Sequence, residues 1–190
     1  MPPKNKFTRE EIVEAAFEIA REEGFSKITA RSVANQLNSS VAPIYVNFKA
    51  IEELVQAVVQ KVFALSEELL VRQKGQNLFE NIGRASLDFA RDYPVLFREL
   101  VLQPNPYMAS YEDTEEVMVE ALKDNEEMKG WSMEERRMLF LKMRIFQLGL
   151  SAIVANGHAP SWLGEKESEE LLMETGKQLL LAEQLKREEG

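Results

Sequence analysis

The feature that most constrains this chain is the spacing of its apolar residues, which recur at every third or fourth position along almost its whole length. This is the period of a helix that buries one face. No convincing alternation of apolar and polar residues interrupts it, and Asn-Gly hairpin turns between β-branched runs are absent. The sequence therefore predicts an all-α protein of about nine helices.

The first helix has clear start and stop signals. Thr8 and Glu11 form a T-x-x-E capping box, in which each side chain accepts a hydrogen bond from the other residue's backbone N–H. Gly24 is placed to end the helix with a positive φ. The apolar stripe between these signals predicts the buried face, which comprises Ile12, Val13, Ala16, Phe17, Ile19 and Ala20.

Two short helices are predicted next. Thr29 can cap a helix over 30–37, and Ser40 can cap another that begins at Val41, with a turn at Asn38 between them. Pro43 would then be the third helical residue, where its missing N–H needs no partner. Longer helices are expected over 50–74, 78–92, 94–102, 112–126, 132–156 and 165–187, separated by Gly and Pro segments.

Three short helices followed by a long one is the order of a helix-turn-helix, whose second member lies in the major groove of DNA. Here 30–37 would be the supporting helix and 41–47 the recognition helix. The stretch from Ile12 to Leu54 resembles the TetR family of transcriptional repressors. The resemblance is carried by Gly24-Phe25, Thr29, Val33-Ala34, Ile44-Tyr45, Phe48-Lys49 and Glu52-Glu53-Leu54.

The match departs from the family pattern at a few positions. The turn has Asn38 where the family usually has Gly, and Asn tolerates positive φ better than most residues. Ala42 and Pro43 stand where Gly and Thr or Ser are common, Asn47 where Tyr or His is common, and Ile51 where a second Lys is usual. These departures leave the predicted fold intact and make the expected DNA contacts fewer.

The resemblance implies a head at 1–50 that binds double-stranded DNA and a body at 51–190 that dimerises and binds an effector. Phosphate contacts are expected from Ser40, Tyr45, Asn47 and Lys49, and a polar base or phosphate contact from Arg31. The apolar side chains at the start of the recognition helix can pack against thymine methyls. The full set of candidate DNA-binding residues is Lys6, Thr8, Arg31, Ser39, Ser40, Val41, Ala42, Pro43, Tyr45, Asn47 and Lys49.

Each candidate also has a structural alternative. Tyr45 could be a core aromatic residue with its hydroxyl at the surface, Arg31 could form a surface ion pair, and Lys49 could be a solvated charge. Thr8 and Ser40 could each serve as a helix cap, with or without a phosphate contact. The net charge of −9 argues against a nucleic-acid binder, but it is unevenly spread. Residues 1–50 hold seven Lys/Arg against six Asp/Glu, and residues 51–190 hold 16 against 26, so the acidity lies outside the head.

The resemblance to the TetR family also implies that the body forms a homodimer and holds a pocket for a small, largely apolar effector. Long helices with broad apolar faces support a four-helix interface, although an intrachain core would have the same pattern. The candidate interface residues are Phe140, Gly149, Ile153, Leu172, Gly176, Leu179 and Leu180. The candidate pocket residues are Phe89, Tyr93, Phe97, Tyr107, Met118, Met143 and Phe146, a set that any helical core could also contain.

Other classes of protein have little support in the sequence. The chain has no cysteine and one histidine, His158, and it lacks a nucleophile elbow, a P-loop and a dinucleotide fingerprint. We therefore expect no cofactor, no metal and no enzymatic activity. Residues 145–164 lack Asp, Glu, Lys and Arg, but polar residues, Gly157 and Pro160 favour a buried helix end and a loop over a membrane span.

The N-terminus has no apolar run, which predicts a cytoplasmic protein without a signal peptide. Two alternatives to a ligand-released repressor remain open at this point. The first is a helical interaction or structural protein that retains the head only as a packing module. The second is a helical-bundle enzyme, which would need a catalytic role for His158.

Overall fold

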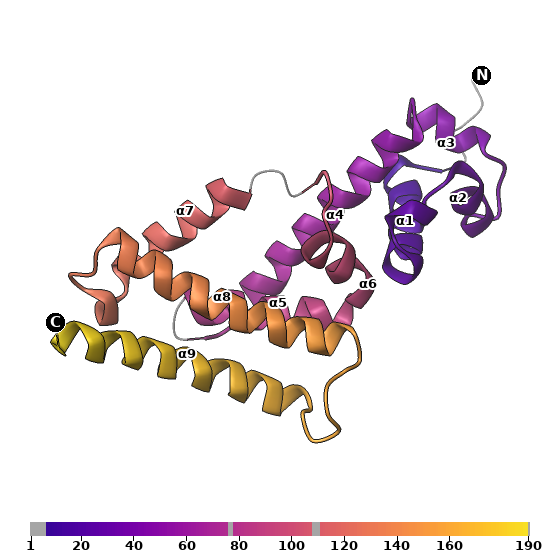
Figure 1. Cartoon of the computed structure of the whole chain (residues 1–190). Helices are drawn as coiled ribbons and strands as arrows, with labels where there is room; N and C mark the ends of the chain where they lie inside the picture. The colour runs from indigo at the N-terminus through magenta and orange to yellow at the C-terminus, as the bar shows by residue number, and fades with distance from the viewer. Residues whose placement is uncertain (1–6, 76–77, 108–110, 190) are drawn as a thin grey trace. The chain divides into compact units, whose positions relative to one another are not determined.

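The computed structural model describes residues 7–75, 78–107 and 111–189 (Figure 1). Every regular element within these ranges is helical, as the apolar period predicts. The α-helices are α1 (Arg9–Glu23), α2 (Ala30–Gln36), α3 (Ala42–Asn47), α4 (Ile51–Arg72), α5 (Leu78–Asp92), α6 (Pro94–Phe97), α7 (Tyr111–Ala121), α8 (Met133–Ala155) and α9 (Glu165–Glu189). Short 3₁₀ turns are η1 (Phe25–Lys27), η3 (Leu122–Asp124) and η4 (Glu126–Met128), and a π-helical turn, η2 (Arg98–Leu102), follows α6.

The chain divides into two compact units. The first comprises residues 1–68 together with 93–107, and the second comprises 69–92 and 108–190. The helix-turn-helix segment therefore belongs to the same unit as residues 93–107, from which α4 and α5 separate it in the sequence. The functional division expected at residue 50 stays a prediction.

The capping signals of α1 are present as predicted. The Glu11 N–H donates to Thr8 Oγ1 at 3.1 Å, and the Thr8 N–H donates to Glu11 Oε2 at 2.7 Å. Gly24 ends the helix with φ 98° and ψ 165°, a positive φ that other residues rarely adopt, although its ψ lies outside the left-handed helical region. A Cβ at this position would also lie 2.8 Å from Cδ of Glu99, so a larger residue would displace the Glu99 carboxylate.

The turn between α2 and α3 follows the prediction at one end and departs from it at the other. Thr29 caps α2, and Ser32 completes a capping box. Asn38 takes φ 49°, as the replacement of Gly by Asn predicts. The expected cap by Ser40 was wrong, because α3 begins at Ala42 and has no side-chain cap. The third residue after Ser40 is Pro43, which has no N–H to donate to a capping hydroxyl.

The core of the first unit combines both of its chain segments. Ile12 of α1, Val33 of α2, Ile44 of α3 and Leu54 of α4 are all almost completely buried. Leu96 and Phe97 of α6 are fully buried as well, in an element that packs against α1. Two aromatic contacts join the segments, with ring centroids 6.3 Å apart for Phe17 and Tyr93 and 5.7 Å apart for Phe25 and Tyr107.

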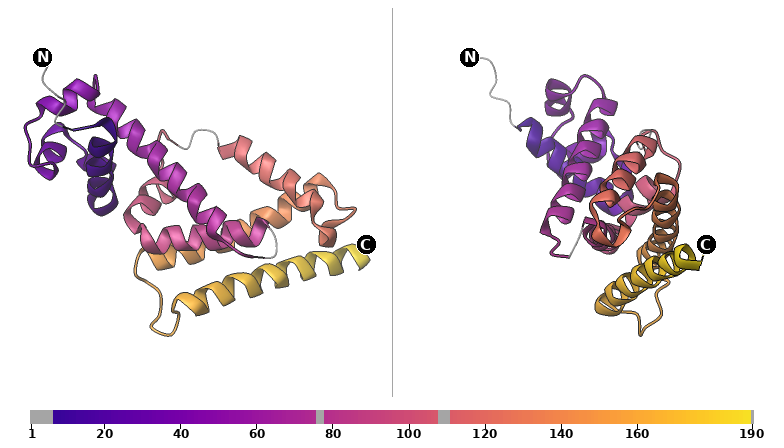
Figure 2. Two further views of the ribbon diagram at one scale, coloured as in Figure 1. Left: turned by 180° about the vertical axis from the view of Figure 1, so that it is seen from behind. Right: turned by 90° about the vertical axis from the view of Figure 1, so that its left-hand side faces the viewer.

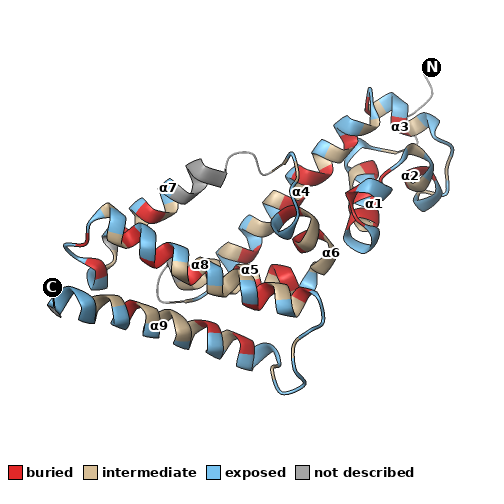
Figure 3. Cartoon of the chain, in the orientation of Figure 1, coloured by how far each residue is buried: buried red, intermediate tan, exposed pale blue. Residues whose placement is uncertain are grey.

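In the second unit, α8 packs against α5, α7 and α9, and α8 and α9 run side by side (Figures 1 and 2). Buried and exposed residues alternate along both helices, which gives each a covered side and an open side (Figure 3). One cluster of buried side chains surrounds Leu139 and Phe140, and another surrounds Leu87 and Leu150. The helix bounds for α5, α8 and α9 agree with the prediction within about two residues.

Helix α8 is also the one helix in the described ranges that is long and apolar enough to cross a membrane. Its mean hydropathy reaches 1.6 over 18 residues. A core helix passes the same test, and α8 buries Leu139, Phe140, Met143 and Leu150 against its neighbours. Residues 145–164 comprise the end of this helix, which stops at Ala155, and the loop after it, as expected, while 33% of the apolar window is buried.

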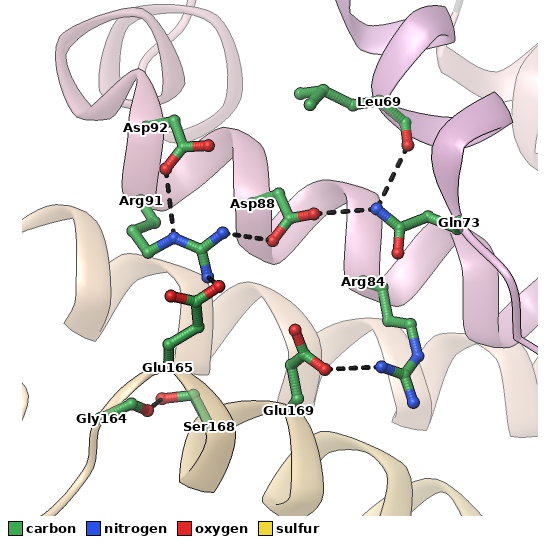
Figure 4. A network of polar contacts seen from close by, with 10 residues as sticks. All are labelled: Leu69, Gln73, Arg84, Asp88, Arg91, Asp92, Gly164, Glu165, Ser168 and Glu169. Carbon is green, nitrogen blue, oxygen red and sulfur yellow. Dashed lines mark hydrogen bonds and ion pairs between the residues drawn. The ribbon is translucent and has the colours of Figure 1, made fainter.

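A polar network fastens the start of α9 to α5 (Figure 4). Arg91 pairs with Asp88 at 2.6 Å and with Glu165 at 3.1 Å, and Arg84 pairs with Glu169 at 2.6 Å. Asp88 also accepts a hydrogen bond from Gln73 at 2.8 Å. The three carboxylates lie close together, but each is paired with an arginine. The cluster is therefore explained as an ion-pair network that holds two helices together.

Candidate nucleic-acid interface

The outward side of α3 is apolar. Val41, Tyr45 and Val46 are 38%, 55% and 65% exposed, whereas Ile44 and Phe48 on the other side of the same turns are buried. Ala42 is exposed and Pro43 is half-buried. This arrangement follows from the helical period, since residues four positions apart share a side. Tyr45 is therefore a surface residue, and the alternative of a core aromatic does not hold.

Three cations lie around the turn and the two helices that it joins. Lys27 precedes α2, Arg31 lies in its first turn, and Lys49 follows α3; all three are exposed. Within the described ranges, none of these three side chains forms an ion pair or a side-chain hydrogen bond with the protein. The ion-pair alternative for Arg31 is therefore not observed, and its guanidinium is available to a partner outside the chain.

The remaining polar candidates have roles inside the protein. Thr8 is the cap of α1, and the Ser39 hydroxyl donates to the Ser40 carbonyl at 3.0 Å. The Asn47 side-chain amide donates to the Pro43 carbonyl at 2.8 Å and to the Phe7 carbonyl at 3.5 Å. Because these bonds use its donor nitrogen, we regard a phosphate contact from Asn47 as the weakest of the predicted set. Lys6 lies outside the described residues.

The junction between α3 and α4 is fixed by Glu53. Its carboxylate accepts the Lys49 N–H at 3.0 Å and lies 3.6 Å from Arg9 of α1. The Arg9 guanidinium also stacks over the Phe48 ring, 4.1 Å from its centroid. These contacts hold the backbone at Lys49 while leaving its ammonium group exposed.

Two residues of this surface were missed by the sequence prediction. Lys27 is the last residue of η1, and the extended residues Ile28 and Thr29 separate it from α2, so no periodic pattern marks it. Val46 follows Tyr45 and was overlooked because valine is usually a core residue. Because Ile44 and Phe48 form the covered side of α3, Val46 lies on its exposed side.

The predicted pocket residues do not form one cluster. Tyr93, Phe97 and Tyr107 belong to the first unit, where they pack against the head. Phe89, Met118, Met143 and Phe146 belong to the second unit, where Met118 and Met143 lie in one apolar cluster and Phe146 in another. Two surface hollows of the second unit are lined by other residues, among them Trp131 and Glu183 in one and Val117 and Glu120 in the other. The pocket therefore stays a prediction.

The predicted interface residues divide into two groups. Phe140, Leu172 and Leu180 are buried within the second unit, and Leu179 is partly buried there. A Cβ added to Gly176 would lie 3.6 Å from Cε of Met143, so this glycine also faces the interior of the unit. Gly149 and Ile153 are exposed. An open apolar side does exist on these two helices. It comprises Met138, Leu141, Ile145, Gly149 and Ile153 of α8 with Leu171, Leu181 and Leu185 of α9.

Comparison with protein families gives one match in the head. The family described as bacterial regulatory proteins, tetR family, matches residues 12–58. This range runs from the first buried residue of α1 to the buried Val58 of α4 and includes the whole helix-turn-helix. A comparison with curated proteins found no match.

Solved structures show the same fold over almost the whole chain. A TetR-like transcriptional regulator from Rhodococcus sp. RHA1 aligns with a TM-score of 0.66 and 17% identity, over 95% of this chain and 99% of that one. SmeT, the repressor of the Stenotrophomonas maltophilia multidrug efflux pump SmeDEF, gives 0.60 and 19%, over 90% and 89%. The fatty acid degradation regulator FadR from Bacillus halodurans gives 0.61 and 14%, over 93% and 97%.

Proposed function

We propose that the chain is a DNA-binding transcription regulator of the tetR family of bacterial regulatory proteins, the family that residues 12–58 match. In finer terms, it is a homodimeric repressor that binds a palindromic operator and leaves it when a small, largely apolar ligand binds. The observation that supports DNA binding best is the surface around α3. There, unpaired cations flank an exposed apolar helix side.

The unpaired cations suit a phosphate backbone. Lys27, Arg31 and Lys49 carry charges that no carboxylate of the described chain neutralises. Binding to duplex DNA releases the counterions that its phosphates condense, so such side chains supply sequence-independent affinity. The Tyr45 hydroxyl can add a phosphate hydrogen bond. The acidity of residues 51–190 would repel DNA from other surfaces.

The apolar side of α3 suits thymine. Val41, Ala42, Pro43 and Val46 have no side-chain donor for guanine, whereas a valine or proline can pack against the C5-methyl group of thymine in the major groove. Arg31 is the best candidate for any polar base contact. The proposed operator half-site is therefore rich in contacted thymines.

A second copy of the chain is the proposed partner for the open apolar side of α8 and α9. Ile145 of α8 and Leu181 of α9 are 62% and 56% exposed, and on α8 exposed residues spaced by three or four positions run from Met138 to Ile153. On α9 the exposed leucines are Leu171, Leu181 and Leu185, with Glu174 and Gln178 between the first two. Two such pairs related by a two-fold axis would form a four-helix interface. Dimerisation would also explain a palindromic operator, because the symmetry of the protein is repeated in its site.

Release by a ligand is the third part of the proposal. SmeT is a repressor of a multidrug efflux pump and FadR a regulator of fatty acid degradation, and both share this fold. A ligand would act here by binding more tightly to a conformation that fits the operator poorly. The apolar residues Met118, Met143 and Phe146 in the second unit are candidates for its lining.

The experiment that tests the proposal is selection of binding sites from random duplex DNA with the purified full chain at low salt. We expect enrichment of a dyad-symmetric sequence whose half-sites are about one helical turn apart, or a multiple of it. A matched selection with Lys27, Arg31 and Lys49 replaced by alanine is the control and should enrich the same sequence much more weakly. No enrichment with the unaltered chain would contradict DNA binding and favour a head that serves only as a packing module.

A further inference from the structure

The side chain of Glu99 reaches the start of the helix-turn-helix from a distant part of the sequence. Its Oε2 accepts a hydrogen bond from the Phe25 N–H at 2.8 Å. Phe25 is the first residue after Gly24, where α1 has ended and the chain turns toward α2. Neither the apolar period nor the resemblance to a family marks Glu99, since it lies 74 residues from Phe25.

The close approach of Glu99 depends on Gly24. A Cβ on Gly24 would lie 2.8 Å from the carboxyl carbon of Glu99, closer than real Cβ contacts allow. Gly24 also has φ 98°, a conformation that other residues rarely adopt. Glycine thus leaves the space that the carboxylate fills, and the half-buried carboxylate accepts the N–H of the first residue of η1, which the turn itself leaves unpaired.

The segment that carries Glu99 is itself held firmly. Glu99 lies in η2, a π-helical turn, and the Asn105 side-chain nitrogen donates to the backbone carbonyls of Glu99 and Leu100 at 3.1 and 2.9 Å. The Asn105 oxygen accepts the Tyr107 N–H at 3.0 Å, and the Tyr107 ring packs on Phe25. A π-helical turn is uncommon and is often found at functional sites.

A short chain of contacts leads from Phe25 to the proposed DNA-binding cations. The 3₁₀ turn η1 ends at Lys27, whose carbonyl accepts a hydrogen bond from the Ser32 hydroxyl at 2.7 Å. Ser32 belongs to the capping box of α2 and follows Arg31 directly. A displacement at Phe25 would therefore move the backbone of Lys27 and the first turn of α2, which carries Arg31.

We propose that Glu99 is a positioning residue for DNA binding, which fixes the turn that presents Lys27 and Arg31 to the operator. The inference rests on the proposed DNA-binding function and extends it to the segment 93–107. Any movement of that segment changes the placement of these two cations. The segment is thereby a means by which DNA affinity can be regulated.

The test compares two variants that separate the reach of the Glu99 side chain from its charge. Glu99→Gln keeps the reach and an acceptor oxygen but loses the charge, whereas Glu99→Asp keeps the charge and is one methylene too short to accept the Phe25 N–H. We expect operator affinity to fall roughly tenfold in Glu99→Asp, a typical size for coupling between sites. It should stay within about twofold of the unaltered chain in Glu99→Gln. Equal affinities, or a larger loss in Glu99→Gln, would overturn the proposal.

Amide hydrogen exchange at Phe25 gives a readout that does not depend on DNA. Exchange should accelerate in Glu99→Asp and remain slow in Glu99→Gln, with the far-ultraviolet circular dichroism unchanged in both. If the unaltered chain bound no duplex, the proposed function would fail, and this exchange comparison would still decide whether Glu99 holds the turn. Unchanged exchange in Glu99→Asp would contradict the proposal by itself.

Two further variants complete the design. Glu23→Gln removes one exposed carboxylate near the same turn and serves as the control for charge, with operator affinity expected to stay within about twofold. Asn105→Ala loosens η2 without altering the Glu99 carboxylate and replaces Glu99→Asp if that variant fails to fold. Operator affinity should fall about threefold in Asn105→Ala, and an unchanged affinity would count against the proposal.

Discussion

The head and the second unit leave different kinds of surface uncovered. Around α2 and α3, Lys27, Arg31 and Lys49 are exposed without a carboxylate partner in the described chain. In the second unit, Arg84 and Arg91 are paired with carboxylates of α9, although Lys74, Lys129 and Lys177 are exposed without an ion-pair partner in the described chain. The second unit also leaves apolar residues uncovered, on one side of α8 and at Leu171, Leu181 and Leu185 of α9. Each region thus leaves open the kind of surface that an external partner would cover.

This contrast teaches that unsatisfied groups indicate function better than the abundance of a residue type. The chain as a whole is acidic, with a net charge of −9, and by total charge it would not be taken for a DNA-binding protein. What distinguishes the head is that its unpaired cations belong to the helix-turn-helix segment or lie next to it in the sequence. What distinguishes the second unit is which apolar residues remain exposed.

The largest effect is expected from a charge placed on the exposed apolar side of the second unit, and it concerns dimerisation. Ile145→Glu or Leu181→Glu would place a charge in the proposed interface, where an unpaired buried charge costs on the order of 3–5 kcal/mol. We expect both variants to sediment as monomers at concentrations where the unaltered chain is a dimer. Val117→Glu, on the exposed side of α7, is the matched control and should remain dimeric. A monomeric unaltered chain, or dimeric variants, would refute the assignment of this side.

The next largest effect is expected on operator affinity when the unpaired cations of the head are removed. Replacing Lys27, Arg31 and Lys49 together by alanine should weaken binding to the selected operator on the order of 100-fold at moderate salt. Lys74, Lys129 and Lys177 are exposed in the second unit, and their triple replacement makes the same change in net charge. Fluorescence anisotropy with a labelled operator would measure both. Similar losses in the two triple variants would mean that overall charge, and not the head, determines binding.

A smaller effect on operator affinity is expected when the methyl groups of contacted thymines are removed. Replacing a contacted thymine by uracil removes only the methyl group, and we expect a loss of roughly 1 kcal/mol at each such position. Val41→Ala and Val46→Ala should make binding insensitive to some of these replacements, because the partner of the methyl group is then gone. Competition between operator duplexes would reveal the loss. If no position responded to uracil, α3 would have to read DNA in another way.

The smallest effect concerns the ion pairs of the second unit. Hydrogen bonds from Lys142 at 2.5 Å and Lys186 at 3.0 Å lower the pKa of Glu183 below its usual 4.5. The stability that this carboxylate contributes is therefore present above about pH 4.5 and is lost as the pH falls through the lowered pKa. Glu183→Gln should flatten the decline of unfolding free energy as the pH falls below about 4.5, measured by urea denaturation.

The exposed Glu188 of the same helix is the control for this measurement, and Glu188→Gln should leave the acid dependence unchanged. The same decline in Glu183→Gln and in the unaltered chain would show that other carboxylates determine the acid stability. In that case the Lys142–Glu183 pair would contribute little despite its geometry.

Much of the fold could be predicted from the sequence, because helix period and capping are local. The Thr8 and Thr29 caps, the positive φ of Asn38 and the span of α5 all follow from residues a few positions apart. The error at Ser40 had a local cause too, since Pro43 provides no N–H to cap. Local rules therefore succeed or fail for reasons visible in the sequence.

The rest depended on contacts between distant residues. The sides of α8 and α9 that are covered within the chain include Phe140, Leu172 and Leu180, and which side faces inward is decided by α5 and α7. The packing of residues 93–107 with the head, and with it the hydrogen bond between Glu99 and Phe25, likewise has no local signal. Lys27 could be identified as a candidate DNA-binding residue only from the structure, in which it has no ion-pair partner among the described residues.

The measurement that tests the central claim most directly is the salt dependence of operator binding, compared between the unaltered chain and the Lys27, Arg31 and Lys49 alanine variant. If these cations neutralise phosphates, the slope of log affinity against log salt concentration should become shallower by about 0.9 for each phosphate that is no longer neutralised. The Lys74, Lys129 and Lys177 variant should retain the slope of the unaltered chain. Equal slopes for all three proteins would contradict the claim that the unpaired cations of the head bind DNA.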